Sequence, residues 1–102
     1  IIVIFQPHLY SRTKSFYQEF ARVLKKADKA FITEIYPARE KPIPGITSKL
    51  ITDLDSDLTF CQKSNIVKRL LQIIKPGDLI LTMGAGDIYE IHKNLINKIA
   101  GK

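Results

Sequence analysis

The segment IIVIFQPHLYSRT, residues 1–13, joins a predicted strand to a predicted helix. Five residues that favour β-structure, Ile1–Phe5, come first, and an amphipathic helical pattern starts near Thr13. In open α/β sheets, ligands bind at such junctions, at the carboxyl ends of strands. A helix that begins near Thr13 also points free N–H groups and the positive end of its dipole at this loop, which favours an anion. A capped helix with a few solvated polar residues is the alternative.

The rest of the chain alternates between strand and helix patterns. The expected elements are a helix over about 13–27, a strand over 30–35, a loop over 36–46, a short helix over 48–54, a strand over 58–61, a helix over 64–74, a strand over 78–83 and a closing helix from 88. This order predicts an α/β domain with a mainly parallel sheet of at least four strands, right-handed crossovers and helices on both faces. The apolar run Leu79–Leu81 is typical of a strand that is buried on both faces.

Composition limits the classes of protein to which the chain can belong. It has 102 residues, of which 45% are hydrophobic, so it forms one domain. The net charge of +6 is compatible with nucleic acid and with small anions, and charge alone does not separate the two. The only cysteine, Cys61, lies among apolar residues, so we expect a buried thiol in a reducing compartment. Because the first residue is Ile1 rather than Met, we expect an excised part of a longer protein.

Three loops carry the candidate site residues. The first, over 6–12, offers an imidazole, a guanidinium and hydroxyl groups, which belong to His8, Arg12, Tyr10 and Ser11. The second, over 36–46, holds Arg39 and Glu40, although an ordinary crossover stiffened by its three prolines is the alternative. The third contains Gly84 and Gly86, which allow a tight turn but form only a weak dinucleotide motif. A parallel sheet places all three loops at one carboxyl edge, and no spacing of Cys and His residues indicates a metal site.

Three motifs together resemble a known family. FQPHLYSRT (5–13), YPAREKPIPG (36–45) and LTMGAGDI (81–88) resemble the C-terminal domain of the Mur ligases, and the match covers essentially all 102 residues in order and spacing. The resemblance is strongest to the members that add L-alanine. It implies a Rossmann-like three-layer fold. It also implies that the longer enzyme is a cytoplasmic ligase that joins L-alanine to UDP-N-acetylmuramate in peptidoglycan precursor synthesis, through an acyl phosphate and a tetrahedral intermediate.

The resemblance also implies how the longer enzyme is divided. Residues 1–102 correspond to a single domain on the amino-acid side, and we expect its usual opening segment, with a Tyr and His-rich motif, to be missing. The absent N-terminal and central domains bind the UDP-sugar and ATP with Mg²⁺, so the chain alone is expected to be inactive and to hold no cofactor. Neither a membrane nor nucleic acid is an expected partner.

Site roles follow from the same resemblance. His8 matches the family's histidine in the first loop, and Arg12 matches its second arginine. Arg12 suits a bidentate contact with the alanine carboxylate, and His8 suits substrate orientation or stabilisation of the negative charge on the intermediate. The other candidate substrate-binding residues are Tyr10 and Ser11, and the candidate loop contacts are Arg39, Glu40, Gly84 and Gly86.

Two departures from the family pattern and two competing functions remain open at this point. Many relatives have arginine where this chain has Leu9, and many have glycine where it has Arg39. A Mur ligase that adds another amino acid or a peptide is the nearest alternative. A small basic module that binds nucleotide or nucleic acid without catalysis is the alternative from another class.

Overall fold

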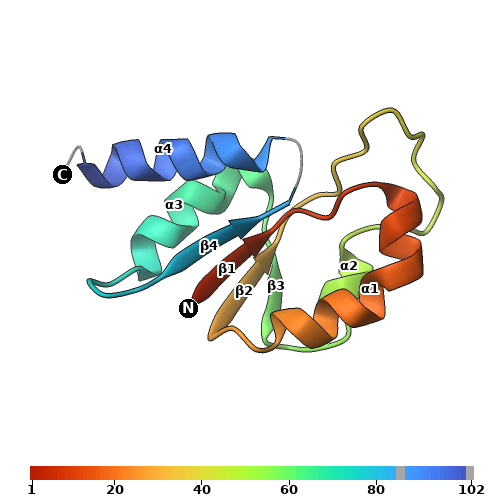
Figure 1. Ribbon diagram of the computed structural model, residues 1–102, viewed down its shortest axis with the longest axis horizontal. Helices are drawn as coiled ribbons and strands as arrows, with labels where there is room; N and C mark the ends of the chain where they lie inside the picture. Colours follow the sequence, from red (N-terminus) through yellow and green to blue (C-terminus); the bar gives the residue numbers. More distant parts are fainter. Residues whose placement is uncertain (85–86, 101–102) are drawn as a thin grey trace.

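The computed structural model describes residues 1–84 and 87–100, which form one parallel sheet between two layers of helices (Figure 1). The elements are β1 (Ile2–Phe5), α1 (Tyr10–Leu24), β2 (Lys29–Ile32), α2 (Lys49–Thr52), β3 (Leu58–Phe60), α3 (Lys63–Ile73), β4 (Ile80–Met83) and α4 (Ile88–Ala100). The strand order is β3-β2-β1-β4, and every pair is parallel. The predicted class, a three-layer α/β domain with four parallel strands, is therefore confirmed.

Each face of the sheet has its own buried cluster, because successive strand residues point to opposite faces. On one face, Ile2 and Ile4 of β1 pack with the apolar stripes of α3 and α4, which include Ile66, Leu70, Ile88, Ile91 and Leu95. On the other face, Val3 packs with Ala21, Leu24 and Ile51 of α1 and α2. The two helical layers lie on opposite sides of the sheet in Figure 1. No helix in the described part of the chain is both long and apolar enough to cross a membrane.

The chain adds strands to both sides of β1, so the order of strands in the sheet reverses there. From β1 the chain crosses to β2 and then to β3 on one side, and it returns to place β4 against the other side of β1. The carboxyl ends of β1 and β4 therefore form the switch point at which ligands bind in open α/β sheets. This position brings the loops after β1, β2 and β4 to one edge of the domain.

β4 is less buried than the sequence predicts. Leu81 and Met83 are each 42% exposed, so the prediction of a strand buried on both faces is wrong. The reason is the position of the strand at an edge of the sheet, where α3 and α4 cover one face. The buried cluster under α1 and α2 contains residues of β1, β2 and β3 but none of β4.

Several boundaries also differ from the sequence prediction. α1 starts at Tyr10 rather than near Thr13, and α3 starts one residue before Ser64. Thr13 is fully buried, and its hydroxyl donates to the carbonyl oxygen of Leu9 at 2.9 Å. The hydroxyl of Ser48 donates to the carbonyl oxygen of Thr33 and makes no capping bond to α2. The helices start early because carboxylates from distant loops bond the N-termini of α1 and α3, as described below.

Gly84 sits where the end of β4 meets the backbone that follows β1. Its φ angle is 146°, and a Cβ atom at this position would lie 2.8 Å from the carbonyl oxygen of Gln6. A real Cβ atom does not approach backbone oxygen so closely, so the backbone would have to move. Glycine is therefore required at this position for close contact between the two strand ends.

We expect Gly84→Ala to destabilise the domain more than Gly77→Ala, which is a matched control. Gly77 also has a positive φ angle, 92°, but nothing lies within 4 Å of its added Cβ atom. Backbone strain alone costs about 1–2 kcal/mol at a left-handed position, and overpacking adds about 1–3 kcal/mol at Gly84. Urea unfolding of both variants measures the difference, and equal losses of stability would contradict the close contact.

Candidate functional site

The loops after β1 and β2 are joined through their backbones. The N–H of Leu9 donates to the carbonyl of Tyr36 at 2.9 Å, and the N–H of Tyr36 donates to the carbonyl of Pro7 at 2.8 Å. These bonds form a parallel bridge between His8 and Tyr36 beyond the ends of the strands. The two rings stack with centroids 5.9 Å apart and an interplanar angle of 18°. The predicted proximity of these loops is confirmed, and His8 is held half-buried against Tyr36.

Glu40 caps the N-terminus of α1 from the second loop. One carboxylate oxygen accepts from the backbone N–H of Ser11 at 3.1 Å, and the other accepts from the hydroxyl of Ser11. The first N–H groups of a helix have no partner within the helix, so this carboxylate supplies what a local cap residue usually provides. Hydrogen bonds from the hydroxyl and then the backbone of Ser11 lower the pKa of Glu40 below its usual 4.5.

At this helix end, the chain itself supplies a negatively charged group, the carboxylate of Glu40. The sequence indicates an anion site from the position of the loop and the helix dipole, but it does not identify Glu40 as an occupant. Glu40 lies 29 positions from Ser11 in the sequence, beyond the range of any local capping motif. A cation that Glu40 does not engage can still attract a further anion to this edge.

Leu9, which is the N-cap residue of α1, has a strained backbone. Its φ angle is 70°, in a region that non-glycine residues rarely occupy. Bonds on both sides hold it there, since its N–H donates to Tyr36 and its carbonyl accepts from the N–H and the hydroxyl of Thr13. Strain of this kind costs of order 1–3 kcal/mol and occurs most often at functional sites. The strained residue directly follows His8.

Arg12 provides a cation that remains available. It lies in the first turn of α1 and is exposed, as is Arg39 in the second loop. Within residues 1–84 and 87–100, the ion pairs join Asp28 to the N-terminus, Lys25 to Asp55 and Lys63 to Asp87, so neither arginine takes part in one. Tyr10, the first residue of α1, is half-buried beside this turn. His8, Tyr10, Ser11 and Arg12 thus all lie where β1 leads into α1.

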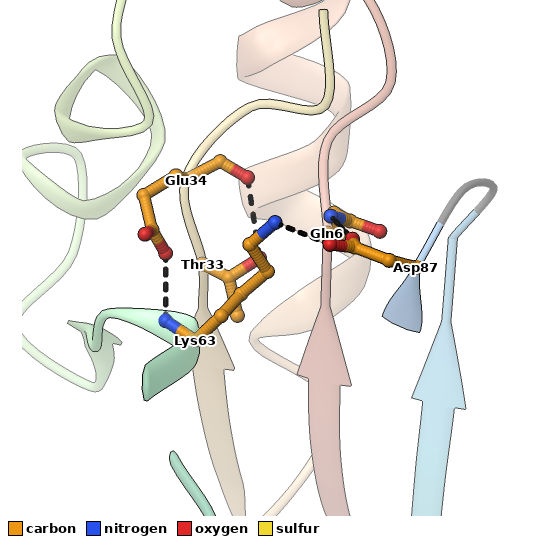
Figure 2. Close-up of polar contacts among 5 residues, drawn as sticks. All are labelled: Gln6, Thr33, Glu34, Lys63 and Asp87. Carbon is orange, nitrogen blue, oxygen red and sulfur yellow. Dashed lines mark hydrogen bonds and ion pairs between the residues drawn. The ribbon is translucent and has the colours of Figure 1, made fainter. Parts of the chain in front are cut away.

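A second polar cluster lies at the switch point, and sequence reasoning missed it (Figure 2). The amide nitrogen of Gln6 donates to one carboxylate oxygen of Asp87 at 2.6 Å, and Nζ of Lys63 donates to the other at 2.8 Å. Bonds from Lys63 first and Gln6 second lower the pKa of Asp87. The backbone N–H of Lys63 donates to Oε1 of Glu34 at 2.7 Å, so Glu34 caps α3. The cluster therefore ties the end of β1 to the starts of α3 and α4.

The signal for this cluster in the sequence is weak. Gln6, Glu34 and Asp87 each follow a strand closely, which places them at the correct edge, but nothing local shows that Gln6 is fully buried. Of the predicted third-loop residues, Gly84 packs against Gln6, and Gly86 lies outside the described residues. A hollow of about 680 Å³ lies between α3 and α4, and none of the predicted site residues lines it.

Comparison with known proteins identifies the kind of domain. No family model matches the chain. The UDP-N-acetylmuramate–L-alanine ligase of Geotalea uraniireducens (strain Rf4) is 42% identical over 99% of the chain. The ligases of the same name from Renibacterium salmoninarum and Thermobifida fusca are both 43% identical, over 98% and 97% of the chain. The chain is a homologue of the C-terminal domain of the Mur ligases.

This Mur ligase domain covers only part of those relatives. It spans 23% of the length of the Geotalea ligase and 22% of each of the other two.

Within the domain, the candidate residues divide into two groups at the same edge. His8, Ser11 and Glu40 belong to the joined loops after β1 and β2, whereas Gly84 belongs with Gln6 at the switch point.

We expect Ser11→Ala to raise the pKa of Glu40 in this Mur ligase domain partway toward 4.5, because the hydroxyl bond is lost while the backbone N–H bond remains. A lowered pKa in the folded state means that ionised Glu40 stabilises the fold at neutral pH. This contribution is lost as the pH falls through the lowered pKa. The stability difference between the original and variant chains should therefore be larger at pH 7 than at pH 2.

Carboxyl-carbon NMR titration measures the pKa of Glu40 directly, and urea unfolding at the two pH values measures the stability difference. Ser15→Ala is the matched control, since Ser15 is exposed one turn further along α1. An unchanged pKa of Glu40 in Ser11→Ala would show that Glu40 does not cap the helix through this hydroxyl.

Proposed function

We propose that the chain is the amino-acid-side domain of an ATP-dependent ligase that joins L-alanine to UDP-N-acetylmuramate in the cytoplasm. The observation that carries this proposal is 40–44% identity over 96–100% of the chain to ligases with that name. The active form is the longer polypeptide, and residues 1–102 alone are inactive. The sheet edge that carries His8 and Arg12 faces the reaction centre formed with the other domains.

Arg12 binds the carboxylate of alanine in this proposal. Its guanidinium is exposed in the first turn of α1 and forms no ion pair within the described residues, so it can receive an anion. Arginine presents two parallel N–H donors that match the two oxygens of a carboxylate. Glu40 already bonds the N–H of Ser11, so the exposed guanidinium of Arg12 in the same turn supplies the positive charge for a second carboxylate.

His8 orients the substrate or stabilises negative charge during amide formation. When the amine of alanine attacks the activated carboxyl carbon, a tetrahedral intermediate forms and negative charge develops on its oxygen. A preorganised hydrogen-bond donor near that oxygen lowers the barrier. The stack on Tyr36 and the backbone bridge fix the position of the imidazole before substrate binds, which supports either role.

ATP and Mg²⁺ belong to the rest of the polypeptide. The described residues contain no group of three His, Cys, Asp or Glu side chains arranged to hold a metal, and the sequence contains no P-loop. In this proposal, ATP and Mg²⁺ are therefore bound mainly by the central domain of the longer polypeptide. The UDP-sugar is likewise assigned to the other domains, and this domain contributes the contacts to the incoming amino acid.

An amino-acid panel tests the proposed substrate. The full-length ligase is mixed with ATP, Mg²⁺, UDP-N-acetylmuramate and one amino acid at a time, and amide formation is followed by mass spectrometry. We expect L-alanine to give the highest kcat/KM. A preference for another amino acid or a peptide would assign the chain to a different Mur ligase. If no amino acid gives a product and the protein instead binds generic DNA in a salt-dependent way, the result would favour the nucleic-acid module.

We expect Arg12→Ala in the full-length ligase to raise the KM for alanine with little change in kcat, because a carboxylate contact present before the reaction is lost. Hydrogen bonds to charged groups contribute about 1.5–3 kcal/mol, which corresponds to an increase of roughly 10- to 100-fold. Arg22→Ala, at an exposed position in the last turn of α1, is the matched control. A KM for alanine equal to that of the control variant would show that Arg12 does not bind the alanine carboxylate.

A further inference from the structure

The imidazole of His8 lacks the hydrogen-bonded partner that commonly orients a functional histidine. Such a histidine often donates from one ring nitrogen to a carboxylate or a carbonyl, which fixes the tautomer and the direction of the ring. Within residues 1–84 and 87–100, no side-chain hydrogen bond reaches either ring nitrogen of His8. The buried side-chain atom that lacks a partner there is Oε1 of Gln6, so the nitrogens of His8 are not buried. The orientation of this ring therefore comes from another contact.

The phenol ring of Tyr36 supplies that contact. The two rings are nearly parallel, with an interplanar angle of 18°, and their centroids are 5.9 Å apart. Stacked rings touch at about 3.5 Å, so the rings are offset, which is a favoured arrangement for aromatic pairs. The imidazole therefore overlaps only part of the phenol ring. Because N–H bonds and nitrogen lone pairs lie in the plane of an imidazole, a fixed plane also fixes the direction in which His8 donates.

Tyr36 is itself held before any substrate binds. Its N–H donates to the carbonyl of Pro7 at 2.8 Å, and its carbonyl accepts from the N–H of Leu9 at 2.9 Å. Immediately after it, the N–H of Glu40 donates to the carbonyl of Pro37 at 2.9 Å and closes a turn. The carboxylate of Glu40 is in turn bonded to the start of α1. The ring that stacks on the imidazole is thus attached on both sides to the first loop and its helix.

We propose that Tyr36 is a positioning residue, whose ring holds the imidazole of His8 so that its N–H points at the negative charge that develops during amide formation. The inference rests on the ligase reaction proposed above and assigns to His8 the second of the two roles given there, stabilisation of charge. A neutral aromatic ring orients the imidazole without the negative charge that a carboxylate partner would add. The hydroxyl of Tyr36 takes no part, since stacking is a contact between ring faces.

Two substitutions at Tyr36 separate the ring from the hydroxyl. Tyr36→Phe keeps the stack and Tyr36→Leu removes it, while both keep the backbone bonds to the first loop. In the full-length ligase, we expect Tyr36→Leu to lower kcat roughly 10- to 100-fold with the KM for alanine within about 2-fold, because the charge develops only in the transition state. We expect Tyr36→Phe to stay within about 2-fold of the unsubstituted enzyme in both constants. A raised KM at unchanged kcat, or equal losses in the two variants, would overturn the proposal.

A double-mutant cycle tests whether Tyr36 acts through His8. In a His8→Ala enzyme, we expect Tyr36→Leu to lower kcat by less than about 2-fold, because the residue that the ring positions is already absent. A loss as large as in the unsubstituted enzyme would show that Tyr36 supports activity by another route, and the proposal would then be wrong. Tyr89→Leu is the matched control, since Tyr89 is 69% exposed on α4, and we expect it to change neither kcat nor KM.

NMR of the labelled histidine rings in the full-length ligase gives a measurement that needs no activity. We expect the ring signals of His8, identified by their loss in His8→Ala, to shift in Tyr36→Leu and to stay near their original positions in Tyr36→Phe. His92 on α4 is the internal control. Unchanged His8 signals in Tyr36→Leu would overturn the stack, even in an enzyme that uses L-alanine, whereas failure to use L-alanine would overturn only the proposed function. If Tyr36→Leu does not fold, Tyr36→Met, which also lacks a ring, replaces it in all three measurements.

Discussion

Two helices in this domain are capped by carboxylates from the segment that follows β2. Glu34 bonds the first N–H of α3, and Glu40 bonds the second N–H of α1. These helices lie on opposite faces of the sheet, so one short segment fixes the starts of elements in both layers. Charge-assisted hydrogen bonds of this kind combine with the helix dipoles, which favour negative charge at N-termini. The orientation of both helices, and of the loop that carries His8, depends on this arrangement.

The capping arrangement also affects how the sheet edge can bind an external anion. A free helix N-terminus would itself attract a carboxylate, but here the first turn of α1 already has one from Glu40. An exposed side chain such as Arg12 can still attract an external anion. In the first turn of α1, a backbone N–H group is thus used to stabilise the fold, while the exposed guanidinium of Arg12 forms no ion pair within the described residues. Three prolines in the second loop restrict its backbone, which helps to hold Glu40 in place.

Sequence reasoning predicts the layers of this fold well and its long-range polar contacts poorly. Helical periodicity identified the buried stripes of α3 and α4, and the lone Cys61 is buried, with burial raising the pKa of its thiol. On α1 the apolar spacing is a poorer guide, because Phe16 and Val23 are 47% and 52% exposed. Hydrophobic periodicity depends on neighbours within one element, so it can be recognised from the sequence without knowledge of the tertiary structure. The start of α1 was misplaced because its cap lies 29 residues away. The cluster of Gln6, Lys63 and Asp87 was missed for the same reason, since it joins three separate elements.

The pairing of the first strand with the last one has a consequence for the order of folding. Ile2 pairs with Ile80, 78 positions along the chain, whereas β1 pairs with β2 at a separation of 27. Closing the longer loop costs more chain entropy, and contacts distant in sequence slow folding. During synthesis, β1, β2 and β3 can assemble while β4 is still in the ribosome. The central strand then keeps one side open until nearly the whole domain has been made, and this side is an exposed template for wrong pairing during that interval.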